Sequence, residues 1–403
     1  MIVEAKPTGM STARLERITE HLDRNYISPG KIAGCQTLVA RHGHVAYFRS
    51  QGYSDLGRHT PMADDTIFRI YSMTKPITSI ALMGLWEQGH FQLSDAVSRF
   101  IPEWADLQVY VSGEGGSMVT RPAARPMTFR HLLNHSGGLS YGFTNHPVDR
   151  AYGSGQVIRT NGETLATFVQ KLGNAPLMYD PGDSWMYSYS TDVCGYLVEA
   201  ISGVPFDQYL QETIFNPLGM VDTAFWVAPE KLPRLAANYI RGPDKKLQML
   251  DDPSNSTYSR EPSFISGGGG LTSTTADYLR FAEMLRRGGE VDGERIIGPR
   301  TLDLMTSNHL PGGRNLASCA IGLFSETKYE GIGFGLGFAM TLDKVMAGLP
   351  CEGEYYWGGA ASTYFWVDPK EDMVALFMTQ LMPSTTFDFR GQLKDIVYSA
   401  IED

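Results

Sequence analysis

Residues 66–88 decide the fold that the sequence predicts, and they read TIFRIYSMTKPITSIALMGLWEQ. A short β-prone run at residues 66–70 leads into Ser72 and Lys75, and an apolar segment typical of a helix follows at once. Residues i and i+3 share a helix face, so Lys75 can reach the Ser72 hydroxyl. A serine on the first helical turn also has a backbone N–H without a helical partner, which is a natural oxyanion donor. We therefore hypothesise that Ser72 is a nucleophile and Lys75 its proton partner.

The SxxK pattern is weak by itself, and it occurs at three places in the chain. Ser28–Lys31 contains Pro29 and Gly30, which favour a turn. Ser325–Lys328 lies in a polar stretch that is typical of a surface segment. Only Ser72–Lys75 begins an apolar helix after a strand. The spacing of Ser72 and Lys75 alone would favour a helix cap with an exposed lysine.

A second serine motif competes with the first. Residues 138–142 read GLSYG and match GxSxG, the nucleophile elbow of α/β-hydrolases. That elbow needs a strand before the serine and a helix after it, whereas here a helix and a Gly-Gly turn precede and a loop follows. Its histidine would have to be His146 or His309. We therefore interpret Ser140 as a loop residue near the cleft rather than a nucleophile.

Composition describes an ordinary globular protein. The chain has 403 residues, enough for two domains or for one domain with an insertion. Its net charge is -10, from 34 basic and 44 acidic residues, and no basic run stands out. Nucleic acid is therefore not an expected partner. An acidic balance of this kind favours solubility.

Cysteine usage and the chain start predict a cytoplasmic protein. No two of the four cysteines form a CxxC pair, so neither zinc nor redox chemistry is indicated, and we expect reduced, mostly buried thiols. Residues 1–19 have no apolar signal core, and no run of about 20 apolar residues exists to span a membrane. His42 and His44 flank a turn glycine, which favours a hairpin over a metal site. No metal and no cofactor are expected.

Strand patterns gather at the two ends of the chain. Strands are predicted at 36–40, 45–48, 334–340, 355–359, 364–367 and 374–378, and helices at 164–172, 192–202, 206–214, 272–287 and 389–401. Residues 111–126 are predicted to be a surface loop, 229–262 irregular and 267–270 a turn. The pattern predicts an α/β (α+β) fold, in which an antiparallel sheet from N- and C-terminal segments is flanked by helices. Residues 1–80 and 215–403 would form this sheet domain, and 81–214 an inserted, mainly helical domain.

Three motifs stand in order along the chain. Ser72-Met73-Thr74-Lys75 is the first, Tyr187-Ser188 followed by Asp192-Val193-Cys194-Gly195 is the second, and Trp357-Gly358-Gly359 is the third. Together they resemble those of the serine β-lactamase and penicillin-binding-protein superfamily. The likeness is greatest to the class C β-lactamase-like carboxylesterases called family VIII esterases, and it implies a β-lactamase-like fold.

The resemblance also implies a mechanism. Ser72 would attack a carbonyl carbon, and Lys75 and Tyr187 would handle its proton, with the general base left open between these two. The backbone N–H groups of Ser72 and Ala360 would form the oxyanion hole. The residues implied in substrate binding are Trp357, Gly358, Gly359, Tyr189 and Tyr141.

Two departures from the class C pattern favour an ester rather than a β-lactam as the substrate. Tyr189 stands where those β-lactamases carry asparagine, and Trp357 where they carry a lysine that helps to hold the β-lactam carboxylate. We therefore expect hydrolysis of small or short-chain esters, with a small-molecule ester as partner and the oligomeric state left open. β-Lactamase, D-amino peptidase or amidase, acyltransferase and non-catalytic penicillin-binding activities stay as alternatives. Aromatic residues that suit either an acyl pocket or core packing are Tyr141, Phe143, Tyr152, Trp185, Tyr189 and Trp357.

Overall fold

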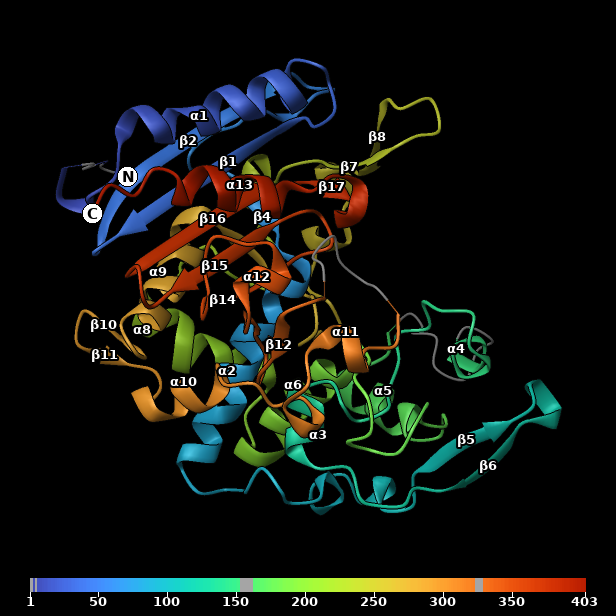
Figure 1. The fold of residues 1–403 in the computed structure, drawn as a ribbon. Helices are drawn as coiled ribbons and strands as arrows, with labels where there is room; N and C mark the ends of the chain where they lie inside the picture. The colour runs from blue at the N-terminus through green and yellow to red at the C-terminus, as the bar shows by residue number, and fades with distance from the viewer. Residues whose placement is uncertain (1–2, 4–5, 153–161, 323–328) are drawn as a thin grey trace.

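An eight-stranded sheet forms the centre of the protein (Figure 1). The computed structural model describes residues 3, 6–152, 162–322 and 329–403. The strand order is β12-β13-β14-β15-β16-β1-β2-β3, and neighbouring strands run antiparallel. N-terminal strands thus continue a C-terminal sheet, which confirms the predicted fold class. The strands are β1 (Gly34–Arg41), β2 (His44–Asp55), β3 (Thr60–Pro61), β12 (Ile332–Phe334), β13 (Ala339–Thr341), β14 (Tyr355–Gly358), β15 (Tyr364–Asp368) and β16 (Met373–Thr379).

Both faces of the sheet are covered. Alternate residues of a strand point to opposite faces, so Leu38 of β1 joins one hydrophobic cluster and Val39 the other. Helices α1 (Thr12–Leu22) and α13 (Phe389–Tyr398) lie side by side over the Val39 face, and α9 (Thr275–Arg286) packs on β15 and β16 at the other (Figure 1). This double cover explains why all of β1 is buried.

The middle of the chain is mainly helical, as predicted. Helix α2 (Thr74–Glu87) packs against α6 (Ser190–Ser202), and it is buried on nearly every side. The other helices are α3 (Phe129–Leu133), α4 (Pro147–Ala151), α5 (Leu165–Leu172), α7 (Phe206–Leu210), α8 (Asn216–Leu218), α10 (Pro299–Met305), α11 (Leu316–Cys319) and α12 (Lys344–Ala347). The division into two domains at residues 80 and 214 stays a prediction.

The single strand predicted at 334–340 is wrong. The chain reverses there, and β12 and β13 pair as two strands of a hairpin. Gly337 has φ +98°, and a Cβ at this position would overlap the Ser79 side chain of α2. The reversal therefore depends on close contact with a helix that is distant in sequence.

Three other segments differ from prediction because they form small strands. Residues 272–274 are not the start of a helix but β9 (Thr272–Thr274), which pairs with β4 (Ile67–Arg69), and α9 begins after it. The expected loop at 111–126 contains most of a hairpin of β5 (Gln108–Ser112) and β6 (Val119–Pro122). In the segment 229–262, β7 (Asn238–Arg241) pairs with β8 (Leu247–Asp251) and with β17 (Leu381–Met382). One more pair is β10 (Glu290–Val291) and β11 (Glu294–Arg295).

Two further expectations concern thiols and membrane spans. The four cysteines are buried and unpaired with one another, as predicted. Within the described residues, no helix has the length and apolar character to cross a bilayer.

Candidate active site

Ser72 lies on a short turn, Tyr71–Met73, between β4 and α2. Tyr71 has φ +42°, a left-handed conformation that is rare for a residue other than glycine and costs about 1–3 kcal/mol. The preceding strand is held firmly because the side chain of Arg69 is completely buried. The Arg69 guanidinium donates hydrogen bonds to Asp251 Oδ2 at 2.9 Å, Ser256 Oγ at 3.0 Å and the Ala236 carbonyl at 2.5 Å.

Lys75 lies one helical turn beyond Ser72. Its Nζ is 3.3 Å from Ser72 Oγ and donates to the Gly268 carbonyl at 2.5 Å. Burial lowers the pKa of Lys75 to about 7, although the charge of Asp192 opposes this shift. A substantial fraction of the amine is therefore neutral near pH 7, so it is able to accept a proton.

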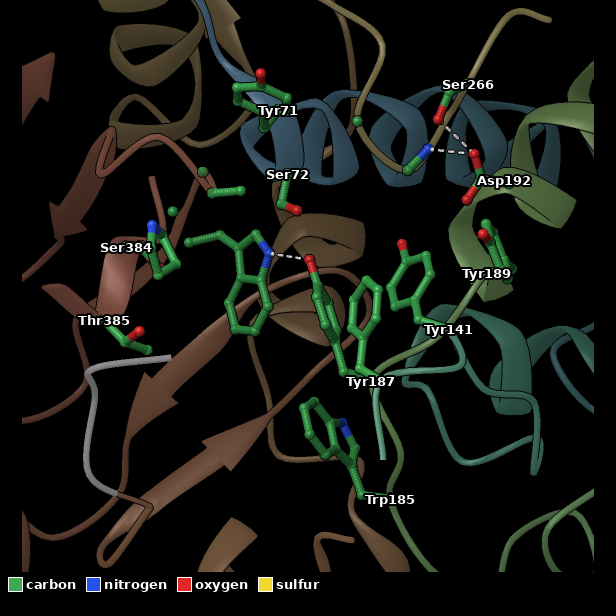
Figure 2. A pocket seen from close by; sticks show the side chains of 18 of the residues that line it. Tyr71, Ser72, Tyr141, Trp185, Tyr187, Tyr189, Asp192, Ser266, Ser384 and Thr385 are labelled. Atoms are coloured by element: carbon green, nitrogen blue, oxygen red, sulfur yellow. Dashed lines mark hydrogen bonds between the residues drawn. The ribbon is translucent and has the colours of Figure 1, made fainter. Parts of the chain in front are cut away.

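Tyr187 brings a hydroxyl to the same place from the segment just before α6. Its hydroxyl makes a hydrogen bond with Ser72. It also accepts one from Trp357 Nε1 at 3.2 Å (Figure 2). Lys75 Nζ lies 4.5 Å from the centre of the Tyr187 ring. Burial raises the pKa of Tyr187, and hydrogen bonds from Ser72 and Trp357 only partly counteract the effect. Tyr187 is therefore a neutral phenol at neutral pH.

A cavity of about 400 Å³ opens above these groups. Gly358, the last residue of β14, and Gly359 lie at its wall, and a Cβ at Gly359 would overlap Thr363 Oγ1 and the Ile70 carbonyl. Glycine therefore lets the end of β14 approach the segment that carries Ser72. Ala360 lines the same wall.

Aromatic side chains form much of the remaining lining. Tyr141, Phe143, Trp185, Tyr189 and Trp357 line the cavity, whereas the sequence left a pocket and core packing equally open for each of them. Tyr152 does not line it: the ring is buried in the core, and its hydroxyl accepts the Ser140 N–H at 3.3 Å.

The other serine motifs have different surroundings. Ser140 is completely buried, and its hydroxyl donates to the carboxylate of Asp149. The two histidines considered as its partners are engaged elsewhere: His146 Nδ1 accepts the Val148 N–H, and His309 Nε2 bonds the Leu304 carbonyl. Ser28 donates to Asp23 on an exposed turn, and Ser325–Lys328 lies outside the described residues.

Sequence reasoning assigned no role at the cavity to several residues of its wall, although Asp192 was part of the second motif. The Asp192 carboxylate accepts hydrogen bonds from Ser266 Oγ at 2.5 Å and from Gly268 N at 3.1 Å (Figure 2). The four glycines at 267–270 were predicted to form a turn, and no local signal shows that Lys75 binds one of their carbonyls. The other residues that sequence analysis did not assign to the cavity are Tyr71, Phe264, Tyr329, Pro383, Ser384, Thr385 and Arg390.

Comparison with known proteins identifies the class. The fold is that of the serine β-lactamase and penicillin-binding-protein superfamily. The model of the beta-lactamase family matches residues 16–397, so the chain belongs to this family. The resemblance drawn from the three motifs is therefore confirmed at this level.

Relatives extend over almost the whole chain. Protein Rv1367c of Mycobacterium tuberculosis is 33% identical over 370 residues, which cover 91% of this chain and 90% of the relative. Esterase EstB of Burkholderia gladioli is 29% identical over 373 residues, covering 87% and 86%. Among solved structures, EstCE1, described as a hydrolase with promiscuous acyltransferase activity, is 26% identical with a TM-score of 0.77, covering 97% of this chain and 99% of that one.

Proposed function

We propose that the protein is a serine carboxylesterase that cleaves small or short-chain carboxylic esters through an acyl-enzyme on Ser72. One observation carries the proposal: Ser72 Oγ lies 3.3 Å from the buried Lys75 amine, at a cavity that Tyr187 and Trp357 also line. A nucleophile beside a base, with an oriented third group, is the arrangement that covalent catalysis needs. The similarity to EstB and EstCE1 supports ester hydrolysis.

Acylation begins when Ser72 Oγ attacks the ester carbonyl carbon and its proton passes to Lys75 Nζ. Lys75 is the general base that is available at neutral pH, because a pKa lowered to about 7 leaves much of its amine unprotonated. Burial raises the pKa of Tyr187, so this phenol keeps its proton at the same pH. The backbone N–H groups of Ser72 and Ala360 would stabilise the oxyanion. One such donor contributes about 3–4 kcal/mol to transition-state stabilisation.

Collapse of the tetrahedral intermediate breaks the ester bond. Tyr187, as a neutral phenol, donates its proton to the leaving alcohol oxygen and recovers one from Lys75. Water then attacks the acyl carbonyl, passes a proton to Lys75, and the acid leaves as Ser72 regains its hydrogen. An alcohol in place of water would give acyl transfer, the second reaction named for EstCE1.

The cavity wall favours esters over β-lactams. Trp357 replaces the lysine ammonium that helps class C enzymes to hold a carboxylate, and its indole N–H is hydrogen-bonded to Tyr187. The substrate-binding residues that we propose are Trp357, Gly358, Gly359, Tyr189 and Tyr141, which all lie at the cavity. We also propose that the chain belongs to the family VIII branch, on its three motifs, and that it works in the cytoplasm, where buried reduced thiols are usual.

A substrate panel tests the proposal. Wild type, Ser72→Ala and Ser140→Ala would be assayed with p-nitrophenyl acetate, butyrate and octanoate, and with nitrocefin as the β-lactam. We expect wild type and Ser140→Ala to hydrolyse the short esters, Ser72→Ala to be inactive, and nitrocefin to be turned over slowly or not at all. Ester hydrolysis that survives in Ser72→Ala but not in Ser140→Ala would overturn the assignment. Absence of turnover with every substrate would favour a binding protein.

A further inference from the structure

Asp192 is a buried carboxylate that the proposed reaction does not use. It lies in the first turn of α6 at the cavity wall, and its side chain is almost completely inaccessible. Its Oδ1 atom accepts hydrogen bonds from Ser266 Oγ at 2.5 Å and from the Gly268 N–H at 3.1 Å (Figure 2). Burying a charged carboxylate costs free energy, which hydrogen-bond donors such as these offset. We therefore asked what the charge of Asp192 does at this place.

Gly268 connects this carboxylate to Lys75. The residue donates its N–H to Asp192 and offers its carbonyl to Lys75 Nζ at 2.5 Å. A Cβ at this position would overlap Asp192 Oδ2, so only glycine fits between the two charged groups. The neighbouring Gly267 carbonyl accepts from Thr78 Oγ1 of α2 at 2.8 Å, which ties the segment to the helix of Lys75.

We infer that Asp192 is a positioning residue for Lys75: it holds the 266–268 segment whose carbonyl orients the amine, and its negative charge stabilises the ammonium that forms when Ser72 gives up its proton. The inference rests on the proposed function, since it concerns the proton acceptor of that reaction.

Among the residues that the structure describes, the other titratable groups around Lys75 carry no negative charge at neutral pH. Tyr187 and Tyr141 present their rings at 4.5 and 5.3 Å, and Tyr187 stays neutral because burial raises its pKa. His135 is also neutral, since burial and the charge of Lys75 lower its pKa well below its usual value. Burial likewise raises the pKa of the Cys194 thiol on α6, so this thiol is neutral. Arg390 of α13 carries a positive charge, which lowers the pKa of Tyr187 slightly against the effect of burial. Asp192 is therefore the carboxylate that offsets the desolvation of Lys75.

The variant Asp192→Asn isolates the charge. Its side-chain carbonyl can still accept from Ser266 and Gly268, so the hydrogen bonds are kept while the charge is lost. The readout is the second-order rate at which a fluorophosphonate probe labels Ser72 between pH 5 and 9. In that reaction Ser72 Oγ bonds to phosphorus, fluoride leaves, and the serine proton passes to Lys75. We expect the acidic limb of the rate profile to move down by about one pH unit, because loss of a nearby negative charge lowers the pKa of an ammonium.

Asp277→Asn is the matched control. Asp277 is also buried and accepts one hydroxyl, from Thr223 at 2.9 Å, and one N–H, from Asp222 at 2.7 Å, but it does not act on Lys75. Its variant should keep the wild-type profile. Asp192→Glu retains the charge and should keep the limb near its wild-type position even if the rate falls. If Asp192→Asn does not fold, Asp192→Ser removes the same charge.

The outcomes separate this inference from the proposed function. The role of Asp192 is overturned if the acidic limb of the labelling-rate profile stays at the wild-type pH, or moves to higher pH, in the charge-removing variant. An equal shift of this limb in Asp277→Asn would overturn it as well. Failure of the probe to label Ser72 in wild type would instead contradict the nucleophile assignment, and the inference would fall with it.

Discussion

Ser72 and Ser140 each belong to a short motif of a known nucleophile, but their hydroxyl groups have opposite surroundings. Ser72 is partly exposed at a cavity, and a buried amine lies 3.3 Å from its Oγ. Ser140 is completely buried, and its hydroxyl donates to the carboxylate of Asp149. A hydroxyl that gives its hydrogen to a fixed carboxylate and cannot be reached by substrate serves the structure. The comparison shows that access and the neighbouring base, rather than the motif, distinguish a candidate nucleophile from a structural serine.

The largest expected effect is the loss of activity in Lys75→Met. Removing the base should reduce kcat for p-nitrophenyl butyrate by roughly 10³-fold, within the usual contribution of general base catalysis. Asp149→Asn, the corresponding change beside Ser140, should leave kcat of the folded enzyme within about threefold, because it removes no group of the proposed site. A loss in Lys75→Met smaller than tenfold would remove Lys75 from the mechanism.

The same variant should change how stability depends on pH. The pKa of Lys75 falls from 10.5 to about 7 on folding, so the unfolded chain binds more protons between these values. Burying Lys75 therefore does not lower the free energy of unfolding above pH 10.5, where the amine is neutral in both states. As the pH falls from 10.5 toward 7, the unfolded chain takes up the proton first, and the free energy of unfolding decreases. Relative to Lys75→Met, the free energy of unfolding of wild type should rise with pH by at most about 1.4 kcal/mol per unit. Urea unfolding at pH 7, 8.5 and 10 measures this difference, and a constant difference would contradict it.

Asp149→Ala tests the structural side of the comparison. It removes the acceptor of Ser140 and of the Thr144 N–H, which lies 2.6 Å from Asp149 Oδ2. Unpaired buried donors are costly, so we expect a loss of about 2–4 kcal/mol in the free energy of unfolding. Asp183→Ala is the control, since that aspartate is exposed and pairs with Arg125 at the surface, and it should cost less than about 1 kcal/mol. Equal losses in the two variants would show that Asp149 has no special role.

The smallest expected effect concerns Trp357→Phe. The change keeps an aromatic ring but removes the N–H that donates to Tyr187 Oη, so kcat should fall about tenfold, the value of one hydrogen bond. In a Tyr187→Phe background the same substitution should cost almost nothing, because the acceptor is already gone. A full tenfold loss in both backgrounds would place the effect of Trp357 in substrate packing.

Prediction from sequence succeeded where the signal is local. The strands at 36–40 and 374–378 follow from short, mostly apolar and β-prone runs, and they pair in the sheet as β1 and β16. It failed at 334–340 and 272–274, where the pattern fits more than one element. The reversal at Gly337 depends on a contact with α2, and β9 forms because β4 lies beside it.

The sequence by itself determined the reach of Lys75 to Ser72, because a separation of three residues fixes geometry on one helical turn. It also determined the family, through three motifs in order. Only the tertiary structure decided the state of these groups. Burial lowers the pKa of Lys75, Trp357 meets Tyr187 across 170 residues of chain, and Asp192 meets Gly268 across 76. Desolvation and long-range contacts arise from packing of distant segments, which local spacing does not encode.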